Sequence, residues 1–131
     1  MKSRVILRVW IPNTSDMDYR WHVFLANLDP VVGSEQGKTR PVLVISEEKI
    51  NQSLSILNVL PITSRKENRF VYPNEVLLKA GTAGLDRESI VLCQQIRTLD
   101  KKRLIKHLGS IPEDTVQFEI LEALSFQLGM K

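Results

Sequence analysis

Short apolar segments rich in β-branched residues follow one another along most of the chain, and this pattern restricts the fold to a small, mainly β domain. Glycine, proline and polar residues separate the segments, as is typical of strands joined by turns. Strands are predicted over residues 22–28, 41–46, 54–62, 69–71, 75–78, 90–93 and 95–99. The last two segments form either a strand pair or one bent strand.

One helix is predicted near the C-terminus, over residues 112–128. Pro112 suits the first turn of a helix, and the two acidic residues that follow suit the positive end of the helix dipole. Apolar residues then recur at helical spacing, at Val116, Ile120, Leu121, Leu124 and Leu128. The polar segment 47–53 is long enough for one helical turn. Together these elements predict a mainly β (α+β) fold, a strongly bent sheet or partly open barrel with short peripheral helices.

Length and composition exclude several classes of protein. A chain of 131 residues suits one domain, and its 43% hydrophobic content is that of a folded protein. The single cysteine, Cys93, cannot form an internal disulfide, which is compatible with a reducing cytosol. No apolar run reaches the roughly 20 residues of a membrane helix. Residues 1–19 differ from the rest, with a possible strand at 4–11, and are interpreted as an atypical N-terminal extension to a domain spanning 20–131.

Metal and nucleotide chemistry have little support in the sequence. The two histidines, His22 and His107, and Cys93 show no metal-ligand spacing. Cys93 lies in an apolar segment, so a place in the core is the simpler interpretation than a nucleophile. Neither glycine-rich nucleotide-binding loop is present. We therefore expect no metal and no cofactor.

The loop at 33–41 (GSEQGKTRP) concentrates polar groups between two predicted strands. Its glycines allow backbone amides to approach an anion closely, and Arg40 supplies a fixed positive charge. Ser34 and Gln36 are neutral hydrogen-bonding groups, and Glu35 is a carboxylate. The alternative is a solvated connector without a function.

Two further segments could contact phosphate. Thr63 follows an apolar strand, so its hydroxyl would be free to contact a phosphate oxygen, although an ordinary turn is also possible. The short stretch 97–106 contains five cations and only one anion, Asp100. The cations are Arg97, Lys101, Lys102, Arg103 and Lys106. Such a density of charge can follow a phosphate backbone, or it can simply be a solubilising surface; the net charge of +3 permits a polyanionic partner without requiring one.

Three segments together resemble the MazF/PemK family of toxin endoribonucleases. They are NLDPVVGSEQGKTRPVLVIS (27–46), VLPITS (59–64) and VLCQQIRTLDKKRLIKHLGSI (91–111). Their order and spacing are those of the family, and the resemblance covers roughly residues 20–130. The combination of GSEQ, RP, PITS and QIRTLD is specific.

The resemblance implies the fold, the activity and the partners. The expected fold is a small SH3-like barrel of the CcdB–PemK type with short helices and a C-terminal helix. The expected function is that of the toxin of a type II toxin–antitoxin system, a cytoplasmic homodimer that cleaves single-stranded RNA such as mRNA at selected sequences without a metal ion. A cognate MazE-like antitoxin is the expected protein partner.

The family's site residues carry over onto this chain position by position. The resemblance assigns Arg40 and Thr63 as catalytic, with Glu35 assisting. The ribose 2′-oxygen attacks the adjacent phosphorus and the 5′-oxygen leaves, so the site must stabilise negative charge and move two protons. The expected RNA contacts are Ser34, Gln36, Ser64, Arg65, Lys66 and Arg97.

The chain departs from the family in two places, which leaves alternatives open. Arg20-Trp21-His22 stands where the family usually has Arg-Gly-Asp, and Leu92-Cys93-Gln94 lacks the carboxylate of the Arg-Cys-Asp segment that some members use. One alternative is therefore a catalytically impaired member that binds antitoxin or RNA without cutting it. Another is a CcdB-like toxin that binds gyrase, but the C-terminal residues 127–131 lack the Trp-Gly-Ile of that relative.

Overall fold

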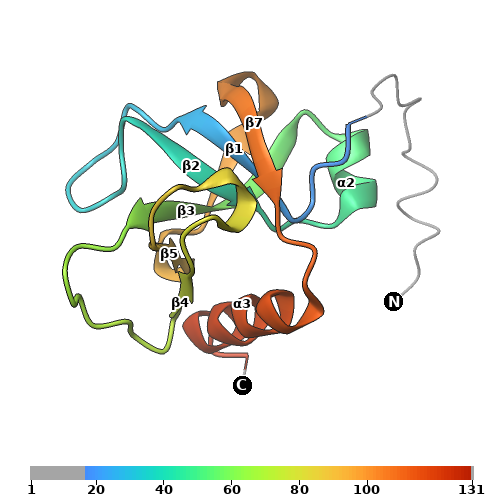
Figure 1. The fold of residues 1–131 in the computed structure, drawn as a ribbon. Helices are drawn as coiled ribbons and strands as arrows, with labels where there is room; N and C mark the ends of the chain where they lie inside the picture. Colours follow the sequence, from blue (N-terminus) through green and yellow to red (C-terminus); the bar gives the residue numbers. More distant parts are fainter. Residues whose placement is uncertain (1–16, 131) are drawn as a thin grey trace.

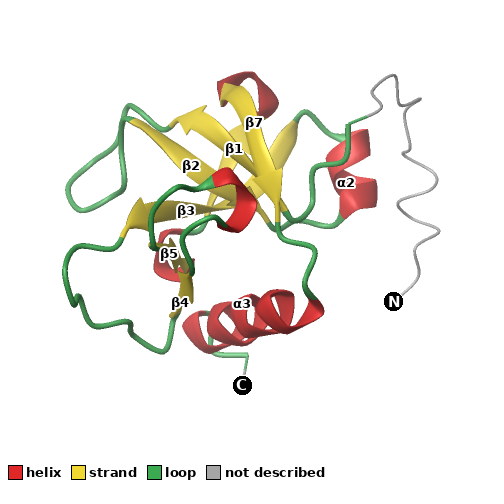
Figure 2. Ribbon diagram, in the orientation of Figure 1, coloured by secondary structure: helices red, strands yellow, loops and turns green. Residues whose placement is uncertain are grey.

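The chain forms one bent antiparallel sheet with a helix against part of it (Figures 1 and 2). The computed structural model describes residues 17–130, so the strand expected at 4–11 lies outside the described residues. The seven strands are β1 (His22–Asn27), β2 (Thr39–Val44), β3 (Ile56–Ser64), β4 (Glu75–Leu78), β5 (Ser89–Leu92), β6 (Arg97–Asp100) and β7 (Leu104–Ser110). The helices are α2 (Glu48–Ser53) and α3 (Asp114–Gln127), with short 3₁₀ turns η1 (Thr82–Gly84), η2 (Cys93–Gln95) and η3 (Lys101–Arg103).

These elements confirm the predicted mainly β class and the C-terminal helix. The sheet is open, with the strand order β4-β5-β3-β2-β1-β7, and β6 pairs with β3 beside this path. None of the helices in residues 17–130 has the length and apolar character needed to span a membrane.

Strand β3 organises the sheet because it has partners on both edges. On one edge β2 pairs with it, in the register Val42 to Pro61 and Val44 to Val59. On the other edge β6 pairs with its first half and β5 with its last three residues. Segments β5 and β6 thus form one bent strand interrupted by η2, which was one of the two predicted alternatives. Pro61 lies at the interruption, between the residues of β3 that pair with β6 and those that pair with β5.

Two predictions about strands were wrong. Residues 69–71 were predicted as a strand but form a loop, in which Phe70 is 65% exposed and Arg69 bonds to Glu75. The strand β7, at 104–110, was missed. It is an edge strand with an exposed, basic first half, so it lacks the continuous apolar run that marks a buried strand.

Alternating side chains divide the core into two clusters on the two faces of the sheet. One cluster contains Leu43, Leu60 and Ile62 and is covered by Ile120 and Ala123 of α3. The other contains Phe24, Ala26, Val42, Val44 and Val59. Cys93 is fully buried in the first cluster, as expected, and burial together with the nearby Glu75 charge raises the pKa of its thiol to about 12.

Two glycines allow η1 to pack directly on β7. A Cβ atom at Gly84 would lie 2.2 Å from the Leu108 carbonyl oxygen, and one at Gly109 would lie 2.5 Å from the Ala83 carbonyl carbon. Gly84 also has a φ of +77°, which L side chains rarely adopt. Backbone therefore meets backbone at this contact, with no space for a side chain.

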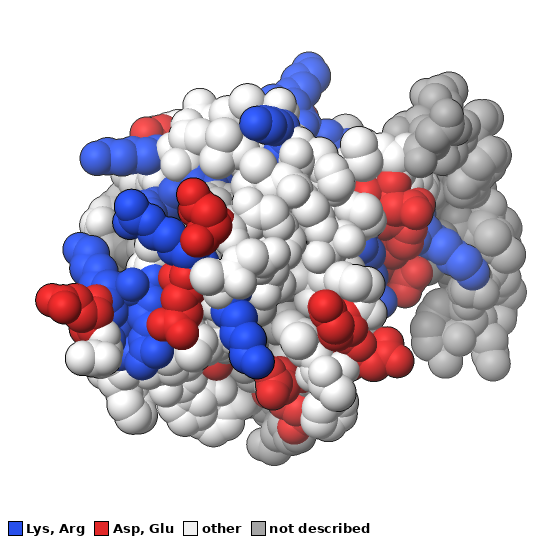
Figure 3. Space-filling view, in the orientation of Figure 1, with Lys and Arg blue, Asp and Glu red and all other residues white. Residues whose placement is uncertain are grey.

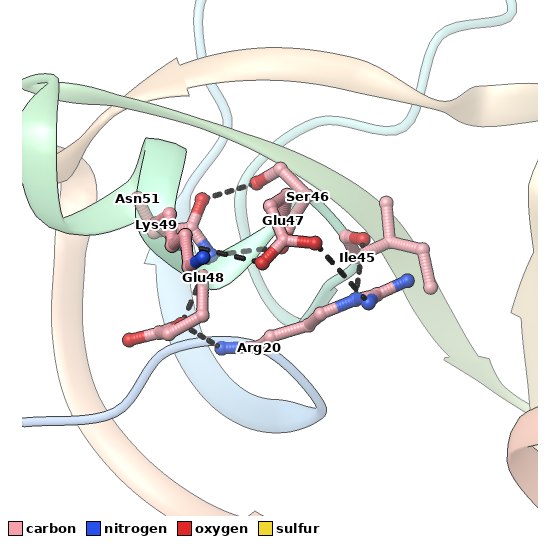
Figure 4. A network of polar contacts seen from close by, with 7 residues as sticks. All are labelled: Arg20, Ile45, Ser46, Glu47, Glu48, Lys49 and Asn51. Atoms are coloured by element: carbon pink, nitrogen blue, oxygen red, sulfur yellow. Dashed lines mark hydrogen bonds and ion pairs between the residues drawn. The ribbon is translucent and has the colours of Figure 1, made fainter. Parts of the chain in front are cut away.

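Polar contacts hold the start of the described chain against α2 (Figure 4). The Arg20 backbone N–H donates to Glu48 Oε1 at 2.8 Å, and its Nε donates to the Ile45 carbonyl at 3.1 Å. Ser46 Oγ donates to Oδ1 of the fully buried Asn51, whose amide donates to Glu48. The predicted helical turn at 47–53 is thereby confirmed and held by its neighbours.

A buried carboxylate holds the long loop between β3 and β4. Glu75 is fully buried at its side chain and accepts two hydrogen bonds from the Arg69 guanidinium, at 2.8 and 2.9 Å. Gln94 Nε2 and the Tyr72 backbone N–H also donate to it. The bond from Arg69, more than any other contact, lowers the pKa of Glu75 to about 2, although burial alone would raise it.

We expect Glu75→Gln to lower the free energy of unfolding by about 2–3 kcal/mol at pH 7, because Arg69 then lacks its carboxylate. The pKa of Glu75 is depressed on folding, from 4.5 to about 2. Its contribution to stability is therefore full above pH 4.5 and is lost as the pH falls toward 2. Urea unfolding measures the free energy of unfolding of wild type and variant. The difference between the two free energies should narrow by up to about 2 kcal/mol when the pH is lowered from 7 to 3.

A matched control is Glu88→Gln. Glu88 is half exposed and pairs with Arg65 at 3.1 Å. Loss of this exposed ion pair should lower the free energy of unfolding by less than about 1 kcal/mol. If wild type and Glu75→Gln differed in free energy of unfolding by the same amount at both pH values, the low pKa assigned to Glu75 would be contradicted.

Candidate active site

The pairing of β2 with β3 brings together two of the predicted site residues. Val42 lies opposite Pro61, and continuing this register by two residues places Arg40 opposite Thr63. Residues at opposite positions of an antiparallel pair point to the same face of the sheet. Arg40 and Thr63 are twenty-three positions apart in the sequence, and the sheet makes them neighbours at the open end of this strand pair.

A small cavity lies at this end of the strands. Its volume is about 180 Å³, and both Arg40 and Thr63 line it, together with the predicted RNA contact Ser64. The other lining residues are Thr39, Pro41, Ile62, Leu85, Asp86, Arg87 and Ser89. The residues that line the cavity therefore include two arginines, one aspartate and several serines and threonines.

The side chains of Arg40 and Thr63 keep hydrogen-bonding groups that the rest of the protein does not use. Arg40 Nε donates to the Gly37 carbonyl at 3.0 Å, which holds the guanidinium in place. Within residues 17–130, its two terminal nitrogens and the Thr63 hydroxyl have no hydrogen-bond partner. A planar guanidinium whose two terminal nitrogens are both unused is suited to binding phosphate oxygens.

Arg87, Asp86 and Ser89 line the cavity and were not found by the sequence reasoning. They lie between η1 and the start of β5, in the segment Asp86-Arg87-Glu88-Ser89. Ser89 is buried, and its hydroxyl donates to the Arg87 carbonyl at 2.9 Å. The only signal in the sequence was a charged tetrapeptide directly after a glycine-containing turn, and such segments are common at surfaces.

Glu35 lies apart from Arg40 and Thr63. It lines a different cavity, of about 340 Å³, with Gln94, Gln95, Ile96 and Arg97. Its Oε1 accepts from the Val32 backbone N–H at 2.9 Å. The structure thus brings Arg97 to Glu35, and Arg40 to Thr63, but does not place the four in one cavity.

The two neighbours of Glu35 contact a single side chain. Gln95 Nε2 donates to the Ser34 carbonyl, and Gln95 Oε1 accepts from the Gln36 backbone N–H, both at 3.2 Å. Gln36 Oε1 is buried and, among the described residues, has no hydrogen-bond partner. Gln95 therefore holds the β1–β2 loop against η2.

The remaining residues predicted to contact RNA differ in how many of their charged groups already bond to the protein. Arg65 donates to Glu88 and to the Arg69 carbonyl, so part of its guanidinium is already occupied. Lys66 is exposed. Arg97 donates to the Leu28 carbonyl at 3.0 Å through one terminal nitrogen. Figure 3 shows Lys and Arg side chains gathered on the left of this face, with several carboxylates among them.

The Trp21-His22 departure does not abolish the turn before β1. Trp21 has a φ of +67°, a conformation that glycine adopts most easily, and the Arg20 guanidinium lies 5.3 Å from its ring centroid. Its backbone bonds to Val44 and Ile111, so the turn is anchored on two sides. Burial, followed by the proximity of His107, lowers the pKa of His22.

Among residues 17–130 no three His, Cys, Asp or Glu side chains come together in a way that could hold a metal ion. His22 Nδ1 and His107 Nε2 are 2.8 Å apart, across β1 and β7, but they have no third such neighbour.

Comparisons with known proteins identify the family and the fold. The family model described as "PemK-like, MazF-like toxin of type II toxin-antitoxin system" matches residues 19–128. A crystal structure of MazF (form I) from Deinococcus radiodurans is 32% identical with a TM-score of 0.71, covering 92% of this chain and 99% of that one. A MazE–MazF structure (form II) from the same organism is also 32% identical, with a TM-score of 0.65 and coverage of 89% and 99%.

A third similar structure is described as an endoribonuclease in complex with its cognate antitoxin from a mycobacterial species. It is 22% identical with a TM-score of 0.71, and the alignment covers 88% of this chain and 98% of that one. At this identity the likeness concerns the fold. The family match, by contrast, extends over most of the chain. The chain therefore belongs to the family of PemK-like, MazF-like toxins of type II toxin–antitoxin systems.

Proposed function

We propose that this toxin is an endoribonuclease that cleaves single-stranded RNA without a metal ion. The observation that carries the proposal is the shared cavity of Arg40 and Thr63, two residues from different strands that line one small space. Structures of two similar proteins are described as endoribonucleases, which supports the same reaction class. A cavity of this size can hold a phosphate group, whereas the rest of the substrate would lie on the surrounding surface.

The proposed reaction is an internal displacement at phosphorus. The ribose 2′-oxygen forms a bond to phosphorus, the bond from phosphorus to the 5′-oxygen breaks, and the products are a 2′,3′-cyclic phosphate and a 5′-hydroxyl. Arg40 donates two hydrogen bonds to the non-bridging oxygens as negative charge accumulates on them. Thr63 donates one more, and Arg87 adds a second positive charge at the wall of the cavity.

Two protons must also move in this reaction. The 2′-hydroxyl loses one as it attacks, and the leaving 5′-oxygen gains one. Asp86 is the carboxylate that lines the cavity, so it is the candidate acceptor here, whereas Glu35 lies in the neighbouring cavity. Glu35 would assist by binding the substrate rather than by taking the proton.

The RNA strand would extend from the cavity over the nearby basic surface. Ser64 lies in the cavity wall, and Arg65 and Lys66 follow it directly in the loop after β3. Arg97 lines the second cavity, and Ser34 and Gln36 of the β1–β2 loop bond to Gln95 in its wall. These residues would contact phosphate oxygens and unstacked bases, as is common for single-stranded RNA.

Two protein partners belong to the proposal, a MazE-like antitoxin and a second copy of the chain. The antitoxin is supported by the MazE–MazF structures of a 32% identical relative. The homodimer is supported by the outer face of α3, where Phe118 is 63% and Phe126 58% exposed, beside an apolar cavity of about 730 Å³ against β4. Apolar side chains on both faces of a helix indicate that both faces become covered.

We expect Arg40→Ala to reduce RNA cleavage by a factor of about 10²–10³, because the variant loses donors to the charged transition state. Wild type should cut a long unstructured RNA into discrete fragments in the presence of EDTA. The measurement is the initial rate of fragment formation on a sequencing gel, with Lys49→Ala on α2 as the control variant. Lys49 is exposed and does not line the cavity, so its loss should leave the rate unchanged.

Two results would argue against the proposed function. Equal rates for Arg40→Ala and wild type would remove Arg40 from catalysis. Failure of folded wild-type protein to cut RNA, with or without divalent cations, would favour the alternative of a member that binds antitoxin or RNA without cutting.

We expect Phe118→Glu to convert the homodimer into a monomer, because it places a charge in the centre of the apolar face of α3. Molar mass from light scattering coupled to size-exclusion chromatography would measure this change. Lys49→Glu, at an exposed position on α2, is the control and should remain dimeric. An unchanged mass for Phe118→Glu would place the dimer contact elsewhere.

A further inference from the structure

The cavity of about 340 Å³ beside the β1–β2 loop has no role in the proposed cleavage chemistry. Four of its five lining side chains are polar, and Ile96 supplies an apolar wall. The polar groups include a carboxylate, Glu35, and a guanidinium, Arg97. Hydrogen-bond donors and acceptors set against an apolar wall are suited to a flat polar ligand such as a nucleobase.

The structure holds these groups in place before any ligand binds. Gln95 contacts the backbone of Ser34 and Gln36, the two neighbours of Glu35. Glu35 itself accepts a hydrogen bond from Val32 through Oε1 and forms a backbone bond to the same residue. The position of the carboxylate is therefore fixed by both its main chain and its side chain.

Each polar side chain retains unused hydrogen-bonding capacity. Gln94 donates to Glu75 through Nε2, which leaves its Oε1 as an acceptor. Arg97 uses Nη1 on the Leu28 carbonyl, which leaves Nη2 and Nε as donors. Among residues 17–130, Glu35 Oε2 has no partner and is a charged acceptor. The cavity thus offers two acceptors, one of them ionised, and a cationic donor.

Guanine is the base that best complements this set. Its Watson–Crick edge carries two adjacent donors, N1–H and the N2 amino group, and its O6 and N7 are adjacent acceptors that arginine binds well. Adenine and cytosine present one donor group beside acceptors, and uracil presents a single N–H between two carbonyls. We propose that Glu35, Gln94 and Arg97 bind a guanine of the RNA at a fixed position near the cleaved bond; the proposal rests on the proposed function.

The position of the cavity suits a base close to the cleavage site. Arg97 lies opposite Val59 on β3, and Val59 and Thr63 point to the same face because strand side chains alternate. Four residues of strand separate them, or about 13 Å. A short stretch of extended RNA can therefore reach both sites.

The first test maps the cleavage sites of wild type on a long unstructured RNA. A guanine should occur at one fixed position relative to the cut. Replacing that guanine by inosine, which lacks only the N2 amino group, should lower kcat/KM by about 10- to 100-fold. Sites without a fixed guanine, or equal cleavage of guanine and inosine substrates, would overturn the proposal without affecting the proposed ribonuclease function.

The second test assigns the contact to Glu35. In Glu35→Gln the Val32 bond can still form, but the charged acceptor is lost, so the guanine substrate should be cut more slowly while the inosine substrate is cut at nearly the wild-type rate. Glu113→Gln, an exposed carboxylate before α3, should retain the full preference for guanine. An unchanged preference in Glu35→Gln would contradict the assignment.

A binding measurement separates this proposal from the proposed function. Fluorescence anisotropy of short RNAs with guanine or inosine at the test position, bound to Arg40→Ala, requires no cleavage. Tighter binding of the guanine RNA would support the pocket even if wild type did not cut RNA. Equal binding of the two RNAs would overturn it.

Discussion

The pairing of β2 with β3 is the interaction on which the site depends. The register is set by the core, because Val42, Val44 and Val59 must face one cluster while Leu43 and Leu60 face the other. A slip of one residue would turn each side chain toward the opposite cluster, so the packing of both clusters would be lost. The same register places Arg40 opposite Thr63. Burial of apolar side chains in the middle of the strands thereby determines the geometry of polar ones at their ends.

The turn η2 contacts three other parts of the molecule, namely β3, Glu75 of β4 and the β1–β2 loop. It interrupts the edge of β3 and presents two neighbouring amides to different partners. Gln94 bonds to the buried Glu75 of β4, and Gln95 bonds to the β1–β2 loop. The Arg69–Glu75 pair that holds the β3–β4 loop is thus in contact, through one amide, with the wall of the second cavity. This one turn therefore bonds both to the carboxylate that holds the β3–β4 loop and to the β1–β2 loop.

The sequence allowed the fold class, the C-terminal helix and the approach of Arg40 to Thr63 to be predicted, for different reasons. Apolar periodicity indicated α3 directly, whereas the proximity of Arg40 to Thr63 came from a family resemblance. The separation of Glu35 from Arg40 could not be predicted, because it depends on where the loop between β1 and β2 lies over η2. Strand β7 was missed because an exposed edge strand needs few apolar residues. Arg87 was missed because only tertiary structure brings it to the cavity.

The role of Trp21 shows how context replaces a local preference. A residue with a bulky side chain occupies a backbone conformation that usually requires glycine, and the energy lost is of order 1–2 kcal/mol. Two backbone hydrogen bonds and the contact with Arg20 offset this loss. A sequence motif can therefore disappear while the turn that it normally specifies remains.

The backbone contact between Gly84 and Gly109 links the outer edge of the sheet to the cavity wall. The segment that contributes Leu85, Asp86 and Arg87 to the cavity begins directly after Gly84. Any displacement of this contact would be passed on, over only a few bonds, to the cavity that Arg40 and Thr63 line. A ligand or crosslink that moved β7 against η1 would for this reason reshape the cavity without entering it.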